Sequence, residues 1–259
     1  MAEQQHPPHA ADSTDDGLRA GSGGDVRGCA TASAQDRAAD DAAYRAAVVD
    51  LLGALAYGEL TAFSRLAADA DLAPTQPYKA ALAGLAVAEF HHYEALTASL
   101  GEMGVDPEEA MAPFIAPIDA FHDRTRPTGW LEGVVKAYVG DGIATDFYRE
   151  ISAYVDPSTQ ALVRSVLQDV GQAEFAVRVV REAIAADPRI AGRLALWGRR
   201  LVGEALSQAQ RVAVERDALA SLLVGGHNRP GADLAELGRM FARLTDEHTR
   251  RMDRLGLSA

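Results

Sequence analysis

The sequence predicts an all-α protein whose central part is a four-helix bundle. Long alanine-rich segments carry apolar residues at helical spacing, and hydrophobic residues make up 48% of the chain with few aromatics. An aspartate directly before a proline, an order typical of helix starts, occurs at Asp106, Asp156 and Asp187. Clear β-hairpin signals are missing and β-branched runs are short, which argues against a sheet.

Breaks at Pro and Gly residues divide the chain into the expected helices, of which the last two are additions after the bundle. They are placed at about 40–69, 76–103, 128–154, 157–186, 188–224 and 233–255. Asp40 and Asp41 are the expected caps of the first helix. The connector between the second and third helices contains Pro113, Pro117 and Pro127, so we expect it to hold only short helical pieces.

Residues 1–37 differ in composition from the rest of the chain. They are rich in Gly, Ser, Asp, Ala and Pro and lack apolar periodicity. We therefore expect a disordered acidic tail, followed by one helical domain at 38–259. The net charge of −12 argues against strong nonspecific binding of nucleic acid, because affinity for the phosphate backbone comes from Lys and Arg.

Several features of the composition indicate a cytoplasmic protein. The single cysteine, Cys29, allows no intrachain disulfide and no thiolate metal cluster. No segment approaches the roughly 20 uncharged apolar residues that a membrane span needs. The N-terminus also lacks the basic-then-apolar pattern of a signal peptide. We expect a cytoplasmic location without membrane association.

The strongest functional signal is Glu59 followed, thirty residues later, by Glu89-x-x-His92. Residues i and i+3 lie on one face of a helix, so Glu89 and His92 can reach the same point. Glu59 has apolar neighbours at i−4 and i+4, Leu55 and Phe63, which indicate that it faces inward. A carboxylate on one helix and Glu-x-x-His on the next form half of a dinuclear metal site in a four-helix bundle.

A second, altered copy of this pattern follows in the expected third and fourth helices. Asp141 is followed, twenty-eight residues later, by Asp169-x-x-Gln172. Asp replaces Glu in this copy, and Gln172 stands where a histidine is expected. An amide oxygen is a poorer ligand for iron than an imidazole, so the second copy predicts a weaker metal site.

The sequence leaves alternatives open in this second half. Asp146 and Glu150 also lie on the third helix and can share a face. We prefer Asp141 because its separation from Asp169 matches that of the first copy. Glu174, on a neighbouring turn, competes with Gln172.

Several stretches carry a resemblance to a known family. They lie at 55–60, 88–94, 108–114, 135–142 and 194–205. Over residues 51–252, the chain resembles the actinobacterial MiaE-like group of ferritin-like proteins. This group is similar to the tRNA 2-methylthio-N6-isopentenyladenosine hydroxylase.

The resemblance implies a ferritin-like four-helix bundle with two additional C-terminal helices. It also implies a non-haem di-iron protein that activates dioxygen as a hydroxylase, with modified tRNA or a small molecule as substrate and an external electron donor. A homodimer is a further expectation. The implied metal ligands are Glu59, Glu89, His92, Asp141 and Asp169, with Gln172 at the sixth position. Two other readings stay open. One is a metal-depleted bundle with a non-catalytic interaction or structural role, and the weaker one is iron storage.

Overall fold

The computed structural model describes residues 34–168, 171–225 and 231–259, and it places no β-strand within these ranges. The all-α prediction is confirmed. The helices are α1 (Ala34–Ala70), α2 (Gln76–Glu102), α3 (Pro107–Arg124), α4 (Trp130–Ser152), α5 (Pro157–Val166), α6 (Gln172–Ala186), α7 (Ile190–Glu215), α8 (Asp217–Val224) and α9 (Leu234–Leu255).

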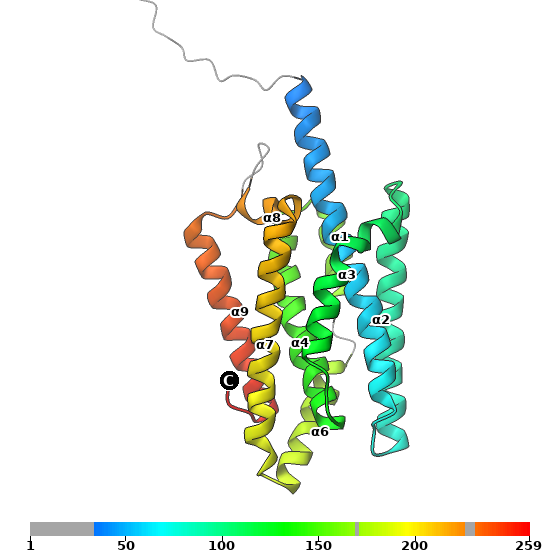
Figure 1. The fold of residues 1–259 in the computed structure, drawn as a ribbon, viewed down its shortest axis with the longest axis vertical. Helices are drawn as coiled ribbons and strands as arrows, with labels where there is room; N and C mark the ends of the chain where they lie inside the picture. The colour runs from blue at the N-terminus through cyan, green and yellow to red at the C-terminus, as the bar shows by residue number, and fades with distance from the viewer. Residues whose placement is uncertain (1–33, 169–170, 226–230) are drawn as a thin grey trace, which may run out of the picture.

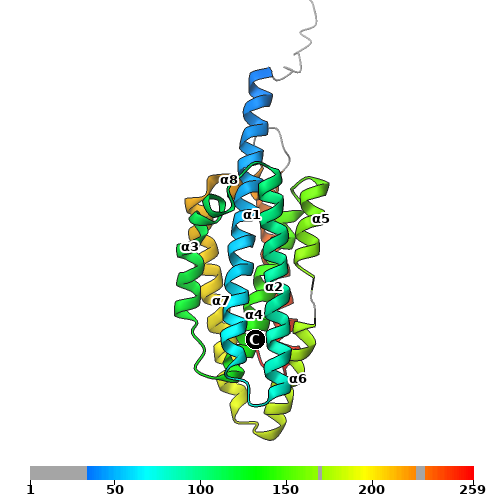
Figure 2. The ribbon, with the colours of Figure 1, turned by 90° about the vertical axis from the view of Figure 1, so that its right-hand side faces the viewer.

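Two helix pairs form the bundle, and the remaining helices cover it (Figure 1). Helices α1 and α2 pack against each other along their length, and α4 packs against α5 and α6. Figure 2 shows α5 and α6 following one another along one edge, where they share the place of a single fourth helix. The additional helices α7 and α9 pack on α4.

The buried apolar residues fall into two clusters that follow one another along the bundle. One contains Leu82 and Val135, and the other contains Leu51, Leu96 and Ile151. Removing apolar surface from water stabilises the fold by about 25 cal/mol per Å². On both α1 and α2, the residues between the two clusters include buried polar side chains. The candidate ligands Glu59 and Glu89 are among them.

The helix caps explain which boundaries the sequence predicts well. Thr75 accepts a hydrogen bond from the backbone of Tyr78 at the start of α2, and Asp106 caps α3. Asp233 caps α9, the last predicted helix. A cap satisfies backbone N–H groups that have no partner within the helix, so its position fixes the first turn. These starts agree with the predicted ones.

The first helix begins earlier than predicted, at Ala34 and not near Asp40. Residues 34–40 are mostly Ala, Gln, Arg and Asp, and the strong helix formers among them allow the helix to extend past the expected cap. Most of the predicted disordered tail, residues 1–33, lies outside the described residues. The disorder of that tail stays a prediction.

The prediction that the proline-containing connector would hold only short helical pieces is wrong. Residues 107–124 form the continuous helix α3, which contains Pro113 and Pro117. Its apolar face is buried at Met111 and Phe114. At Gly53 of α1 an added Cβ would strike the backbone of α3, so the two helices are in close contact there. This packing offsets the backbone hydrogen bonds that proline removes.

Two predicted single helices are interrupted. The predicted fourth helix ends as α5 at Val166 and resumes as α6 at Gln172, after Gly171 with a left-handed φ of 103°. Glycine adopts this conformation without the steric penalty of a side chain. The predicted fifth helix divides into α7 and α8 at Arg216, whose guanidinium binds the carboxylate of Asp50 on α1. Both interruptions depend on conformations and contacts that apolar periodicity does not report.

Helix α1 is the described segment whose length and composition would suffice to cross a membrane, over Ala39–Ala70. The core helix of a soluble protein passes the same test. In this helix 56% of the most apolar window is buried inside the protein, and Asp50 and Glu59 are buried polar residues within it. These observations favour a core helix.

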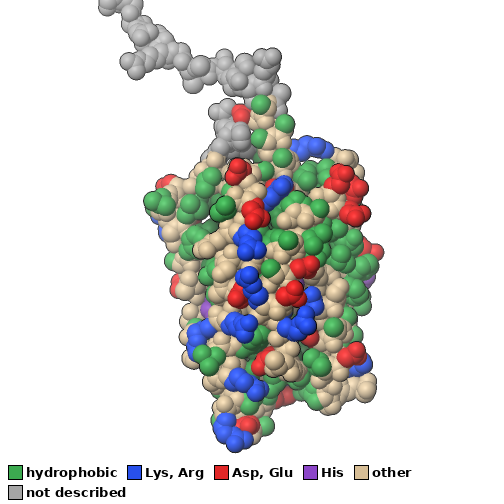
Figure 3. Space-filling view, in the orientation of Figure 1, with side chains coloured by type: hydrophobic (Ala, Val, Ile, Leu, Met, Phe, Trp, Pro, Cys, Tyr) green, Lys and Arg blue, Asp and Glu red, His purple; other side chains and the backbone are tan. Residues whose placement is uncertain are grey.

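The surface mixes both charges. Lys and Arg side chains run down the middle of the face in Figure 3, where Figure 1 shows α7, with acidic side chains beside them. Some arginines of α7 have partners among the described residues. Arg193 of α7 lies 3.8 Å from the carboxylate of Glu132, and Arg200 donates to the backbone carbonyl of Arg124.

Candidate metal centre

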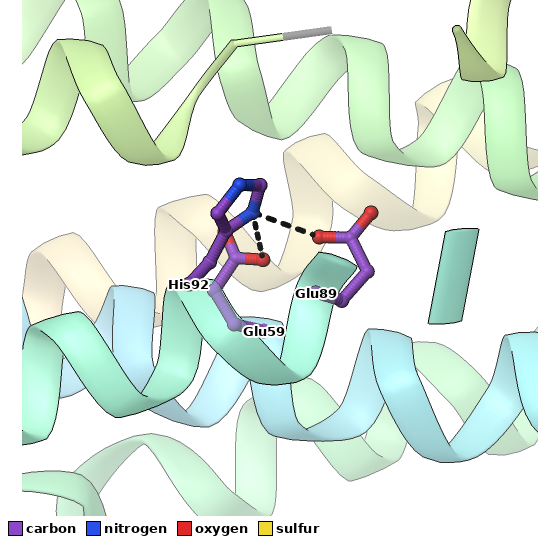
Figure 4. Close-up of side chains that lie close together, drawn as sticks. All are labelled: Glu59, Glu89 and His92. Carbon is purple, nitrogen blue, oxygen red and sulfur yellow. Dashed lines mark hydrogen bonds and ion pairs between the residues drawn. The ribbon is translucent and has the colours of Figure 1, made fainter. Parts of the chain in front are cut away.

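Three of the predicted ligands converge between α1 and α2 (Figure 4). Glu59 projects from α1, and Glu89 and His92 project from α2. The His92 Nδ1 lies 3.4 Å from the Glu59 Oε2 and 3.4 Å from the Glu89 Oε2. The side chains of Glu89 and His92 reach the same point because they are one helical turn apart. The first half of the predicted site is therefore assembled as a cluster.

The cluster is shielded from solvent. Glu59 is 8% exposed and Glu89 is 5% exposed, while the His92 side chain is 18% exposed. Phe63 of α1 and Phe90 of α2 contact each other with ring centroids 5.2 Å apart. Phe63 lies one helical turn after Glu59, and Phe90 directly follows Glu89. This aromatic contact joins the two helices beside the cluster.

Burial and mutual interaction change the acidity of all three groups. Burial raises the pKa of Glu59 well above its ordinary value, and the neighbouring Glu89 adds to the rise, against a lowering hydrogen bond with His92. Burial alone would also raise the pKa of Glu89. Hydrogen bonds with His92 and Glu59 outweigh that effect and lower it. The pKa of His92 rises to about 10 because it faces both carboxylates. A metal cation bound here would displace protons, since metal ligands bind in their deprotonated forms.

The donor set suits a transition metal ion. The three ligand atoms lie within 4.8 Å of one another, and no other group of three or more His, Cys, Asp or Glu in the described ranges meets this criterion. Ligands bound to one ion at about 2.1 Å lie about 3–4 Å apart, and the two separations of 3.4 Å fall in that range. Carboxylate oxygen with imidazole nitrogen is a typical ligand combination for iron, manganese or zinc.

The structure separates the three alternatives on α4. Asp146 is buried and binds Arg251 of α9, and Glu150 accepts hydrogen bonds of 2.8 and 2.7 Å from Arg243 of α9. Asp141 is exposed, and its charge raises the pKa of Glu59. The Asp141 carboxylate is not part of the three-residue group, and its preference as a ligand stays a prediction.

Of the remaining second-half residues, Gln172 and Glu174 lie within the described ranges. Gln172 is buried, and its Nε2 donates a hydrogen bond of 3.1 Å to the backbone carbonyl of Ala137 on α4. Glu174 is exposed in the first turn of α6. Asp169 lies outside the described residues, so its role as a ligand and its shared helix face with Gln172 stay predictions.

Tyr148 on α4 was not among the predicted site residues. Burial raises the pKa of its phenol above the ordinary value, and the charge of Glu59 adds to the rise. Tyr148 follows Asp141 by seven residues, a spacing that returns to the same helix face. That spacing is the signal in the sequence that could have indicated Tyr148.

Comparison with known proteins agrees with the helical bundle. Residues 42–226 match a protein-family model described as a ferritin-like domain of actinomycetes. The chain belongs to this ferritin-like family. No curated protein matches the chain. The predicted ferritin-like fold is confirmed, while the narrower MiaE-like assignment remains a proposal.

Proposed function

We propose that this ferritin-like protein binds iron through Glu59, Glu89 and His92. The observation that carries the proposal is the convergence of two buried carboxylates and one imidazole, with His92 Nδ1 3.4 Å from each carboxylate. A cation at this point would neutralise carboxylates that burial otherwise penalises. Asp141, whose charge raises the pKa of Glu59, is the candidate for a further ligand.

We further propose that the bound iron serves an oxygen-dependent hydroxylase. Iron in a carboxylate and histidine site supplies dioxygen activation when it is bound. The chain's own contribution is to hold the ligands between two apolar clusters, which limits the access of water. The resemblance to MiaE-like proteins supports modified tRNA or a small molecule as substrate, with an external electron donor, in the cytoplasm. A homodimer is compatible with this proposal.

A second candidate is a bundle with an incomplete metal site that acts as a non-catalytic interaction or structural protein. The observation that favours this candidate is that acidic and amide side chains of the second helix pair already have protein partners. Arginines of α9 bind Asp146 and Glu150, and Gln172 donates to a backbone carbonyl. These contacts stabilise packing and do not need a metal.

A direct measurement of bound metal distinguishes the iron-binding function from the non-catalytic one. The purified protein is loaded anaerobically with Fe(II), desalted, and assayed for iron, with Mn(II) and Zn(II) loaded separately for comparison. We expect about one tightly held iron per chain, since one ligand group is complete. Retention of no metal would exclude the iron proposal and leave the non-catalytic candidate.

The hydroxylase part has its own test. The iron-loaded protein is given a chemical reductant, dioxygen and tRNA that carries 2-methylthio-N6-isopentenyladenosine, and the nucleosides are separated by mass. A hydroxylated nucleoside that requires both iron and dioxygen would support the proposal. Iron binding without this product would leave the metal site intact and shift the substrate to a small molecule.

A further inference from the structure

A second candidate site lies on α1, away from the carboxylate cluster. A cavity of about 380 Å³ is lined by side chains of α1, the end of α3, the connection that follows it, and α4. Asp69, in its wall, is ten residues beyond Glu59 on α1, which corresponds to about 15 Å along the helix axis. The volume lies in the range of small-molecule pockets.

Three cationic side chains line this cavity, from three different segments. They are Arg65 of α1, Arg126 of the connection and Lys136 of α4. Arg65 is exposed and makes no hydrogen bond or ion pair with any described residue. Arg126 meets only Asp123, at 3.3 Å, in an exposed pair that contributes little. Two guanidinium groups therefore keep most of their donors available, unlike the paired arginines of α7.

Lys136 is the buried cation of the cavity. It is 7% exposed, and its ammonium donates a hydrogen bond of 2.7 Å to the backbone carbonyl of Thr125 at the end of α3. This contact has a structural role, because it satisfies a carbonyl at a helix C-terminus. An ammonium has three N–H donors, so further donors remain. Burial and the charge of Arg65 lower the pKa of Lys136 to about 8.

The remaining wall is part polar and part apolar. The Nδ1 of His122 is buried without a hydrogen-bond partner among the described residues. Burial, with the charges of Lys136 and Arg65, lowers the pKa of His122 to about 3, so the ring is neutral. Asp69 lies against Gly133 of α4, where an added Cβ would be 2.9 Å from its Oδ2. Apolar surface comes from Ala68, Leu72 and Pro127.

We propose that this cavity binds a small molecule that carries a phosphate group and an apolar body. The phosphate is held by Arg65, Arg126 and Lys136, and the body lies against Leu72 and Pro127. Guanidinium groups bind phosphate oxygens through paired, charge-assisted hydrogen bonds. A phosphate carries a charge of about −1.5 to −2 at neutral pH, which offsets the positive charge that the nearby carboxylates of Asp69 and Asp123 leave unbalanced.

The size and the mixed wall argue for more than inorganic phosphate. Inorganic phosphate would fill only a small part of the cavity and would leave its apolar wall in contact with water. Asp69 would repel a second phosphate, but it can accept a hydrogen bond from a hydroxyl or amino group of the ligand. The site therefore favours a phosphate monoester over a polyphosphate. This inference does not depend on iron binding by the carboxylate cluster.

Isothermal titration calorimetry with defined probes tests the proposal. Phenyl phosphate carries both features of the ligand, inorganic phosphate carries one, and phenol carries the other. We expect phenyl phosphate to bind about tenfold more tightly than inorganic phosphate, and phenol not to bind measurably. Arg65→Gln should weaken phenyl phosphate about tenfold, the effect of losing one charged hydrogen-bond donor. Arg65 is the residue substituted in this test, because Lys136→Met would also remove the hydrogen bond from Lys136 to the Thr125 carbonyl at the end of α3.

Matched variants decide the outcome. Arg164→Gln removes an exposed arginine of α5 outside the cavity and should leave phenyl phosphate binding unchanged. His92→Ala at the metal centre should also leave it unchanged.

Equal weakening by Arg65→Gln and Arg164→Gln would overturn the proposal that the cavity binds the phosphate. A lack of phenyl phosphate binding at 10 mM, on the order of the weakest useful affinities, would also overturn it. Equal affinity for phenyl phosphate and inorganic phosphate would overturn the proposal that the ligand has an apolar body in contact with the cavity wall. An RNA oligomer that binds in an Arg65-dependent manner, while phenyl phosphate does not, would overturn the small-molecule assignment.

Discussion

The two helix pairs of the bundle use similar acidic residues for different purposes. In the α1–α2 pair, Glu59 and Glu89 turn toward one imidazole and leave a point where a cation fits. In the second pair, Asp146 and Glu150 of α4 bind arginines of α9 instead. The comparison indicates that a carboxylate's partner, more than its position in a repeated pattern, determines its role.

Helix α9 is responsible for this difference. Arg251 binds Asp146 and donates a 3.1 Å hydrogen bond to the carbonyl of Gly142. An added Cβ at Gly142 would strike the Arg251 side chain. The glycine beside Asp141 therefore admits a guanidinium from an additional helix. The acidic residues of α4 therefore attach α9 to the bundle, and the carboxylates of α1 and α2 remain available to bind a metal.

The largest expected effect is loss of metal from the first half. His92→Ala removes the only nitrogen donor of the cluster, and we expect iron retention to fall from about one per chain to near zero. Iron analysis after anaerobic Fe(II) loading and desalting measures this. His91→Ala is the matched control, since His91 is exposed on the same helix and should retain iron. Equal iron in wild type and His92→Ala would show that His92 is not a ligand.

The buried ion pair of the second half should affect stability and leave metal content unchanged. Arg251→Met leaves the buried carboxylate of Asp146 without its main partner, and we expect a loss of about 3 kcal/mol in the free energy of unfolding. Urea denaturation measures it. Arg250→Met is the control, because Arg250 pairs with Glu247 on the surface and should change stability by less than about 1 kcal/mol.

A double substitution distinguishes the charge from the packing. Asp146→Leu combined with Arg251→Met removes both buried charges and should recover most of the lost stability. Failure to recover would mean that the contacts of Arg251 with α4 matter more than its charge. Loss of iron in any of these variants would contradict the separation between the two halves.

Substitution of Gln172 tests whether the second half of the bundle can also bind metal. Its amide reaches the carbonyl of Ala137, one turn before Asp141 on α4. Gln172→His places an imidazole on that side of the helix, and we expect iron retention to rise above the wild-type value, because imidazole is the better ligand. Gln172→Asn is the control without an imidazole. An unchanged iron content in Gln172→His would show that the second half is structural only.

Much of the fold can be predicted from the sequence because local signals determine it. The caps Thr75, Asp106 and Asp233 fix helix starts through hydrogen bonds within one turn. The interruptions at Gly171 and Arg216 could not be predicted in the same way. Arg216 depends on Asp50, which is 166 positions away in the sequence. The spacing of apolar residues does not predict such a distant partner.

The same division applies to the candidate site. Glu89 and His92 are one turn apart, so their convergence follows from helix geometry alone, and the apolar neighbours of Glu59 indicate its inward orientation. Helix geometry alone does not show what Asp146 and Glu150 bind. Their partners are arginines of α9, and Asp146 and Arg251 are 105 positions apart. Pattern spacing alone could not predict which acids pair with arginine.

The smallest expected effect concerns the attachment of α5, which the interruption separates from α6. The Asp156 carboxylate accepts hydrogen bonds from the backbone N–H groups of Ser158 and Thr159, each 3.0 Å, and from the Tyr44 hydroxyl of α1, 2.9 Å. Burial alone would raise the pKa of Asp156, but these hydrogen bonds outweigh it and hold the pKa well below its ordinary value.

A lowered pKa in the folded state means that the ionised carboxylate stabilises the fold above about pH 4, the ordinary pKa of aspartate, and loses this effect as the pH falls further. Asp156→Ala should therefore reduce the free energy of unfolding by about 1 kcal/mol at pH 7, the usual effect of removing a helix cap. The difference from wild type should shrink below about pH 4. Tyr44→Phe separates the tie to α1 from the cap. It removes both hydrogen bonds of the Tyr44 hydroxyl, which donates to the Asp156 carboxylate and accepts from the Asp156 backbone N–H, and it keeps the cap contacts with Ser158 and Thr159. Denaturation at pH 7 and at pH 3 measures both variants. A gap of equal size at the two pH values would show that Asp156 acts through its shape and not its charge.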